Sequence, residues 1–297
     1  MKGRVGALNP IYASGGSRIC VTYSVDLQNE AVTLSDYLGA GATFTYVGEP
    51  HCIACDRLVK KLYSGGHCFD CAQSLARCDL CVVSPDRCHF HLGTCREPQW
   101  GEDFCMQPHV VYLANTSGPK IGITRANRMP RRWLDQGAIQ AIAVVQAPTR
   151  RAAGVVEAHF KRKLNDRTDW RRLVSRPAQP VDLVELAHQL KSSLPTFLAL
   201  HNEVLPEDEC GELAWRIDDE AVQIEYPVLA YSPPKRLVLS ADQPHVCDNL
   251  QGIVGQYLLF SQGVINLGDY RGVALELELG AAFAERELSD GDQLSLF

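Results

Sequence analysis

Two pairs of cysteines with the same spacing are the residues in this sequence best suited to chemistry. Cys52 and Cys55 are separated by two residues, as are Cys68 and Cys71, and twelve residues lie between the pairs. Such a turn places two thiolates on one side of a loop, and two facing loops complete a tetrahedron around Zn²⁺. Two consecutive glycines just before the second pair suit the chain reversal that this requires. The spacing predicts a structural zinc site.

A second cluster of metal-binding residue types follows at once, opened by Cys78 and Cys81. The residues that can close it are Cys88, His89, His91 and Cys95, with Cys105 as a more distant choice. We favour Cys88 and Cys95, because thiolates predominate in closed structural sites. The sequence therefore predicts two structural zinc ions, with eight cysteines as ligands.

Basic residues are concentrated in one part of an acidic chain. Residues 120–176 contain 14 Lys and Arg against 4 Asp and Glu, whereas the net charge of the whole chain is −6. A basic island of this kind is typical of a surface that contacts a phosphate backbone, although it could instead dock on the acidic C-terminal third. The candidate DNA-binding residues are Arg125, Arg128, Arg131, Lys161, Arg162, Lys163, Arg171 and Arg172.

The elements that must position these residues can be predicted from local patterns. Residues 109–113 and 120–124 alternate around turn-forming residues and predict a β-hairpin. Pro130 can begin a short helix, residues 139–146 read as a third strand, and Thr149 can cap a helix that runs to about residue 164. A helical region is expected over residues 181–200. The other expected strands are 19–25, 42–47, 228–231, 236–239, 256–260, 264–267 and 273–279.

The stretch from residue 109 to 170 resembles the GIY-YIG nuclease superfamily, in variants whose second motif reads Lys-Ile-Gly. Residues 110–112 stand in the place of the first motif and residues 120–122 in that of the second, although Val110 and Lys120 replace a glycine and a tyrosine. The order of hairpin, short helix, strand and long helix is also that of the family. Carried over to this sequence, the resemblance implies the catalytic residues Tyr112, Lys120, Arg132 and Glu157. Arg131 is the competing choice for Arg132.

The chemistry implied by this resemblance is phosphodiester cleavage. Glu157 would hold one Mg²⁺ or Mn²⁺ ion, because hard cations prefer oxygen ligands. Tyr112 would orient or deprotonate the attacking water, and Arg132 would bind the phosphate. The pattern of the whole chain also resembles a bacterial family of unassigned function.

The last five residues resemble the peptide by which bacterial replication and repair proteins bind the sliding clamp of DNA polymerase III. This clamp-binding peptide is Gln293, Leu294, Ser295, Leu296 and Phe297. Leucine and phenylalanine can anchor in an apolar cleft, while glutamine fixes the register. The alternative is that this apolar end folds back onto the protein.

The patterns together predict an α+β protein of several parts, with a small GIY-YIG-like three-stranded antiparallel sheet at its centre. The expected parts are a β-rich segment 1–50, a two-zinc module 51–106, a nuclease-like module 107–176, a helical connection 177–221, a β-rich segment 222–280 and an acidic tether with the clamp-binding tail 281–297. Residues 254–260 could also join the N-terminal strands in one barrel.

Composition limits the environment and the class of function. Apolar residues make up 46% of the chain, yet no run approaches the roughly 20 residues that span a bilayer. We expect a cytoplasmic protein with no membrane partner, where a reducing environment favours metal binding over disulfides. The leading expectation is a metal-dependent DNA endonuclease recruited by the sliding clamp. The alternatives are a non-catalytic DNA-binding adaptor of the clamp and an RNA-binding zinc protein.

Overall fold

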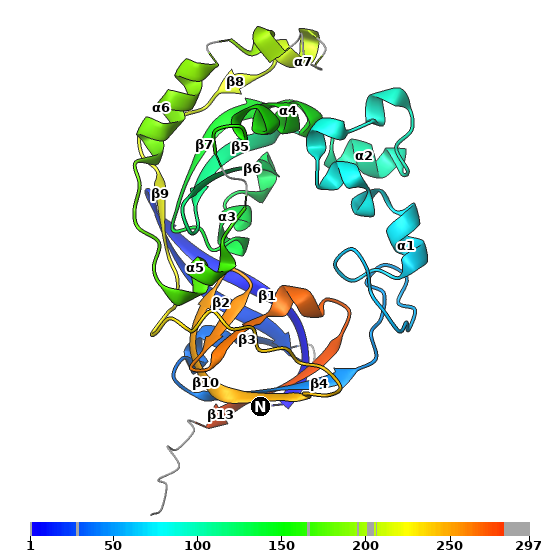
Figure 1. The fold of residues 1–297 in the computed structure, drawn as a ribbon, viewed down its shortest axis with the longest axis vertical. Coiled ribbons are helices and arrows are strands. Elements are labelled where there is room, and N and C mark those ends of the chain that lie inside the picture. The colour runs from blue at the N-terminus through cyan, green and yellow to red at the C-terminus, as the bar shows by residue number, and fades with distance from the viewer. Residues whose placement is uncertain are drawn as a thin grey trace, which may run out of the picture.

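The computed structural model describes residues 2–27, 30–164, 167–194, 196–200, 205 and 207–281, and its architecture is α+β (Figure 1). The clamp-binding tail predicted at residues 293–297 lies outside these residues. Within them, no helix has both the length and the apolar character that crossing a membrane requires.

The strands of the described residues pair into one continuous sheet with the order β12-β11-β10-β4-β13-β1-β2-β9-β7-β5-β6. Strand β3 pairs with β2, and β8 pairs with β7. The strands are β1 (Lys2–Gly15), β2 (Arg18–Leu27), β3 (Glu30–Thr33), β4 (Gly41–Gly48), β5 (His109–Asn115), β6 (Pro119–Arg125), β7 (Gln140–Ala147), β8 (Ala214–Trp215), β9 (Val222–Glu225), β10 (His245–Val254), β11 (Tyr257–Phe260), β12 (Gly263–Asn266) and β13 (Ala274–Ala281).

The α-helices are short and lie mostly in the middle of the chain. They are α1 (Phe69–Ser74), α2 (Pro98–Phe104), α3 (Arg131–Asp135), α4 (Arg150–Phe160), α5 (Trp170–Ser175), α6 (Leu183–Ser193) and α7 (Glu207–Gly211).

Strands from the two ends of the sequence form one part of the sheet. Strand β4 lies between β10 and β13, and β13 also pairs with β1. Phe44 and Phe260 meet edge to face in their shared core, with ring centroids 6.1 Å apart, and the hydroxyl of buried Tyr23 accepts a hydrogen bond from the backbone of Gly255. The N-terminal strands and residues 254–260 therefore pack together.

The predicted hairpin, short helix, third strand and long helix are confirmed at residues 109–160. Strand β5 pairs antiparallel with both β6 and β7. Helix α4 packs Val156 and Phe160 against Val111 of β5, while Trp133 of α3 packs on Tyr112 from the other face. These three strands are not a separate small sheet, because β7 continues into the larger sheet through β9.

Two predicted strands are wrong, and five strands of the structure were not predicted, namely β1, β3, β8, β9 and β10. Residues 228–231 and 236–239 make only isolated bridges, because prolines at 227, 233 and 234 interrupt regular pairing. Strand β10 was missed because Asp248 and Asn249, which are uncommon in strands, interrupt its apolar pattern.

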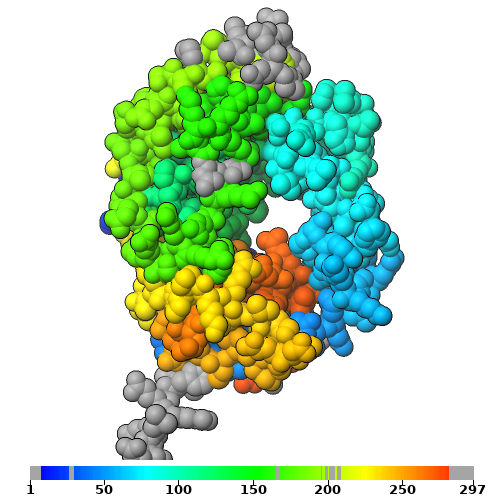
Figure 2. All heavy atoms as spheres, viewed as in Figure 1, coloured from blue at the N-terminus to red at the C-terminus, as the bar shows by residue number. Residues whose placement is uncertain are grey.

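Residues 51–106, which we call the cysteine block, leave the sheet after β4 and return to it at β5. They form α1, α2 and four short 3-10 helices at Ala76–Cys78, Leu80–Val82, Pro85–Arg87 and Phe90–Leu92. In Figure 2 an opening is visible between this block in blue and cyan, the central segment in green and the C-terminal strands in orange.

Candidate functional site

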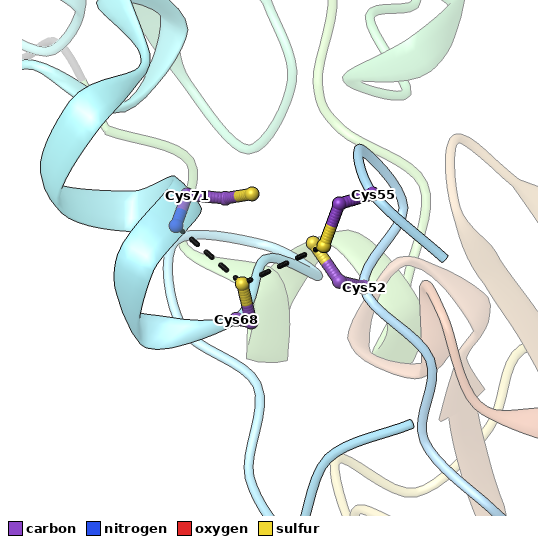
Figure 3. Close-up of side chains that lie close together, drawn as sticks. All are labelled: Cys52, Cys55, Cys68 and Cys71. Atoms are coloured by element: carbon purple, nitrogen blue, oxygen red, sulfur yellow. Dashed lines mark hydrogen bonds between the residues drawn. The ribbon is translucent and has the colours of Figure 1, made fainter. Parts of the chain in front are cut away.

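The four cysteines of the first predicted zinc site converge at the start of the cysteine block (Figure 3). The sulfur atoms of Cys52, Cys55, Cys68 and Cys71 all lie within 4.8 Å of one another. The sulfurs of Cys55 and Cys68 are 3.8 Å apart, which is about the edge of a tetrahedron with Zn–S bonds of about 2.3 Å. These four cysteines can hold a metal such as zinc, as the spacing predicted.

Local backbone structure holds the two cysteine turns in place. In the first turn, the backbone N–H of Asp56 donates to the carbonyl of Cys52 over 2.8 Å. In the second, Cys68 caps α1, and its sulfur accepts from the backbone N–H of Cys71. An ion pair of 2.7 Å between Arg57 and Asp70 joins the two turns.

Electrostatics favour the thiolate form of Cys52, whereas the hydrogen bond with the Cys68 side chain and burial raise the pKa of the Cys71 thiol. Burial raises the pKa of the Cys52 thiol, but the backbone N–H groups of Cys68, Ala54 and Cys55 outweigh burial and lower that pKa to about 6. Thiolates are the form that binds metal. Four thiolates would fill every position around a zinc ion, so the site suits a structural role rather than catalysis.

The second predicted ligand set is not assembled as expected. Cys81, Cys88 and Cys95 line one small cavity, but Cys78 is not among the residues that line it, whereas Cys105 is. Cys78 ends one 3-10 helix, and the chain turns at Asp79 before Cys81, so two cysteines only three positions apart are directed to different places. The lining of this cavity therefore favours Cys105 over Cys78 as the neighbour of Cys81, Cys88 and Cys95.

Two cavities with arginines in their linings adjoin at α3. One lies between α3, Ile53 of the cysteine block and C-terminal residues in the range 256–275, and the other lies between α3, β6, the start of α4 and Val82 of the block. Their volumes are about 420 and 310 Å³, and they share Arg128 and Asp135. Six arginines line them, against Asp135 as the acidic residue. This set, which we call the arginine wall, is Arg125, Arg128, Arg131, Arg132, Arg150 and Arg271.

Positive charge is concentrated in this wall. The pKa of the Arg125 guanidinium is lowered, first by burial and then by the charges of Arg128 and Arg150. Arg125 also lies over the ring of Phe104, 4.4 Å from its centroid. Because arginine remains protonated in proteins, the cavity carries positive charge that an anion would neutralise.

The structure brings some of the predicted DNA-binding residues together and separates others. Arg125, Arg128, Arg131 and Arg132 share the arginine wall. Arg131 has a further task there, since it pairs with Asp135 at 3.0 Å and donates to the carbonyl of Leu8, holding α3 to β1. The remaining predicted residues, Lys161, Arg162, Lys163, Arg171 and Arg172, do not line either cavity.

Trp170 lies among these basic residues in the sequence and has packing partners of its own. Its ring stacks on Tyr257, and the guanidinium groups of Arg171 and Arg236 lie over it at 4.9 and 5.0 Å. Arg172 pairs with Asp169.

Two members of the arginine wall, Arg150 and Arg271, were missed from the sequence. Arg150 occupies the first turn of α4, where the helix dipole is positive and a basic side chain is unfavourable. A basic residue directly after a capping threonine breaks a local rule and could have marked this position as functional. Arg271 belongs to an acidic part of the chain, so no local signal marked it.

Three of the four implied catalytic residues are buried, whereas the fourth, Arg132, is exposed in the arginine wall. The Tyr112 side chain is 1% exposed, and its hydroxyl accepts from Gln136 at 2.6 Å. Burial raises the pKa of Tyr112, although Arg132 and Gln136 lower it in part, so the phenol is not activated as a base. Lys120 is buried and donates to Thr168. Glu157 is buried and pairs with Lys161 at 3.3 Å.

Comparison with known proteins identifies the family. A family model described as "Protein of unknown function (DUF2797)" matches residues 39–275. The chain belongs to this family. The resemblance to GIY-YIG nucleases is thereby corrected, because the matched family is a different one and is of unknown function. Each of the two motifs has only three residues, and both are altered in this sequence. They therefore carry too little information to assign a superfamily. No curated protein and no solved structure matches the chain.

Proposed function

We propose that this DUF2797 protein binds DNA along the arginine wall, in an opening framed by a zinc-holding cysteine block. The observation that carries the proposal is that the charged residues lining two adjoining cavities, of about 420 and 310 Å³, are six arginines and one aspartate. Because the aspartate pairs with Arg131, the other five guanidinium groups gain most from an anion with several charges.

A phosphate backbone fits this lining better than a single small anion does. Each guanidinium presents a planar pair of donors that matches the oxygens of one phosphate. The wall extends over two cavities, with Arg125 and Arg150 in one and Arg271 in the other. The N-terminus of α4, at Arg150, adds the positive end of a helix dipole. Successive phosphates of a strand would therefore be bound at successive arginines.

Fluorescence anisotropy with labelled oligonucleotides tests this proposal. The variant Arg128→Glu/Arg132→Glu reverses two exposed charges in the wall, and we expect its affinity for DNA to fall by at least about tenfold. The control Lys191→Glu/Arg216→Glu makes the same charge change at exposed positions outside both cavities. Equal losses in the two variants would overturn the proposal, as would binding of RNA but not DNA.

DNA cleavage is a second proposal, favoured by the position of Glu157. This buried carboxylate is close enough to Tyr112 to raise the pKa of the phenol, and Arg132 acts on the same phenol. Glu157 would have to exchange its pairing with Lys161 for a Mg²⁺ or Mn²⁺ ion. Incubation of branched, nicked and single-stranded DNA with either metal should yield products with the native protein and not with Glu157→Gln. Identical results for the two proteins would exclude this role.

A further inference from the structure

A small cavity in the second half of the cysteine block brings together cysteines from four separate segments. Its volume is about 10 Å³, room for about one atom of the size of a water molecule. The cysteines that line it are Cys81, Cys88, Cys95 and Cys105. Cys88 and Cys105 are buried, at 7% and 5% exposure. Four soft ligands around an atom-sized space are the composition of a closed metal site.

A competing ligand group lies beside this cavity. The ligand atoms of Asp79, Cys81 and His89 are within 4.8 Å of one another. Asp79, however, already accepts from the backbone N–H of Cys81 and pairs with Arg96 at 2.7 Å. A guanidinium at that distance neutralises the carboxylate and would repel a metal cation. The ring of His89 has a partner of its own in Thr94, at 2.7 Å. These contacts account for the group without a metal.

We propose that Cys81, Cys88, Cys95 and Cys105 bind a second structural zinc ion as four thiolates. In the structure these four sulfurs do not all lie within 4.8 Å of one another, so zinc binding would have to draw them together around the cavity that they line. Binding would release the thiol protons to solvent, because zinc binds the thiolate form. Cys78, which does not line the cavity, takes no part.

The segments that carry the proposed zinc ligands also contact Arg150 of the arginine wall. The carbonyl of Cys105 accepts a hydrogen bond from the backbone N–H of Arg150, and the Arg150 guanidinium donates to the carbonyl of Val82, next to Cys81. The metal would therefore hold both segments that position Arg150 in the arginine wall. Loss of the ion would therefore loosen the position of Arg150 in the arginine wall.

X-ray absorption at the zinc edge of the full-length native protein tests the ligand set without any substitution. We expect two zinc ions per chain with a shell of sulfur alone at about 2.3 Å. A shell that contains nitrogen or oxygen at about 2.0–2.1 Å would support the group of Asp79, Cys81 and His89 and overturn the proposal. One zinc ion per chain would overturn it as well.

Matched variants assign the second ion to its ligands. Cys105→Ser should lower the zinc content from two ions to one, whereas Cys78→Ser and His89→Gln should leave two. If Cys105→Ser does not fold, cobalt titration of the native protein replaces it, with the expectation of two equivalents bound with intense thiolate-to-cobalt absorption. Loss of an ion in Cys78→Ser or His89→Gln, or only one equivalent of such absorption, would contradict the assignment.

Discussion

His109 is a histidine whose surroundings keep it neutral. It is fully buried at the start of β5, and its Nδ1–H donates to the carbonyl of Gln107 at 2.6 Å. Burial lowers its pKa to about 4, and the nearby charges of Arg150 and Arg125 act in the same direction. It is thus a structural hydrogen-bond donor rather than a base exposed to substrate.

This burial makes folding stability depend on pH. As pH falls below about 6.5, His109 becomes protonated in the unfolded chain but not in the folded protein, so stability is lost down to about pH 4. The loss from one such group is about 1.4 kcal/mol per pH unit. Urea unfolding between pH 7 and 4 should show a shallower pH dependence for His109→Gln than for the native protein. The same change at exposed His188 is the control and should leave the dependence unaltered.

Substitution of a cysteine in the first cluster should have effects that substitution of an exposed cysteine elsewhere does not have. Cys52→Ser should remove one zinc ion per chain and make the cysteine block easier to cleave by protease, because metal binding and local folding are coupled. Cys20 and Cys247 are exposed, and a serine at either position should change neither property. Unchanged zinc content in Cys52→Ser would contradict the site.

At the scale of elements, one glycine fixes the cysteine block against helix α4. A Cβ atom at Gly154 would lie 2.5 Å from the Cβ of Pro85 and 2.6 Å from the backbone nitrogen of Asp86. Helix and block therefore touch at a distance that only glycine allows. This contact lies one turn along α4 from Arg150, so it helps to set the arginine wall.

Gly154→Ala should lower the stability of the protein although alanine is the better helix former. The gain in helix propensity is about 0.5–1 kcal/mol, whereas overpacking against backbone costs about 1–3 kcal/mol. Gly211→Ala, also in a helix but with open space around it, is the matched control and should be neutral or slightly stabilising. The midpoint temperature of thermal unfolding should fall for Gly154→Ala. For Gly211→Ala it should stay the same or rise slightly. A stabilised Gly154→Ala variant would contradict the close contact.

At the scale of the whole molecule, basic and acidic residues are concentrated in different parts of the chain. Residues 120–176 carry most of the excess positive charge, while residues 177–297 contain 6 basic and 20 acidic residues. A protein with a net charge of −6 is repelled from DNA except where arginines gather. Attraction would therefore be local to the arginine wall and would weaken as salt increases.

The clamp-binding peptide, residues 293–297, is predicted to act apart from this wall. Removal of these residues should abolish co-purification with the sliding clamp of DNA polymerase III and leave the affinity for DNA unchanged. Leu296→Ala/Phe297→Ala is the conservative form of the same test, because it removes the apolar anchors and keeps the chain length. Clamp binding that survives both changes would contradict the prediction.

Elements with regular local patterns could be predicted well. The hairpin of β5 and β6 is specified by alternation around turn residues, and α4 by the Thr149 cap, whose side chain accepts from the backbone N–H of Ala152. The first four-cysteine cluster follows from spacing alone, because each pair forms within a single turn. Strand β10 could not be predicted, since it depends on pairing with β4, about two hundred residues away in sequence.

What the sequence by itself determined is the local chemistry: the paired cysteine turns, the basic island and the order of elements in residues 109–160. Only the tertiary structure decided which of these residues meet. It placed Arg271 from the acidic C-terminal part beside Arg128 of the basic island, and it exchanged Cys78 for Cys105 around the second cavity. The physical reason is that spacing along a chain fixes contacts only within a turn or a helix. Contacts between distant segments are set by the packing of the sheet and the cysteine block against each other.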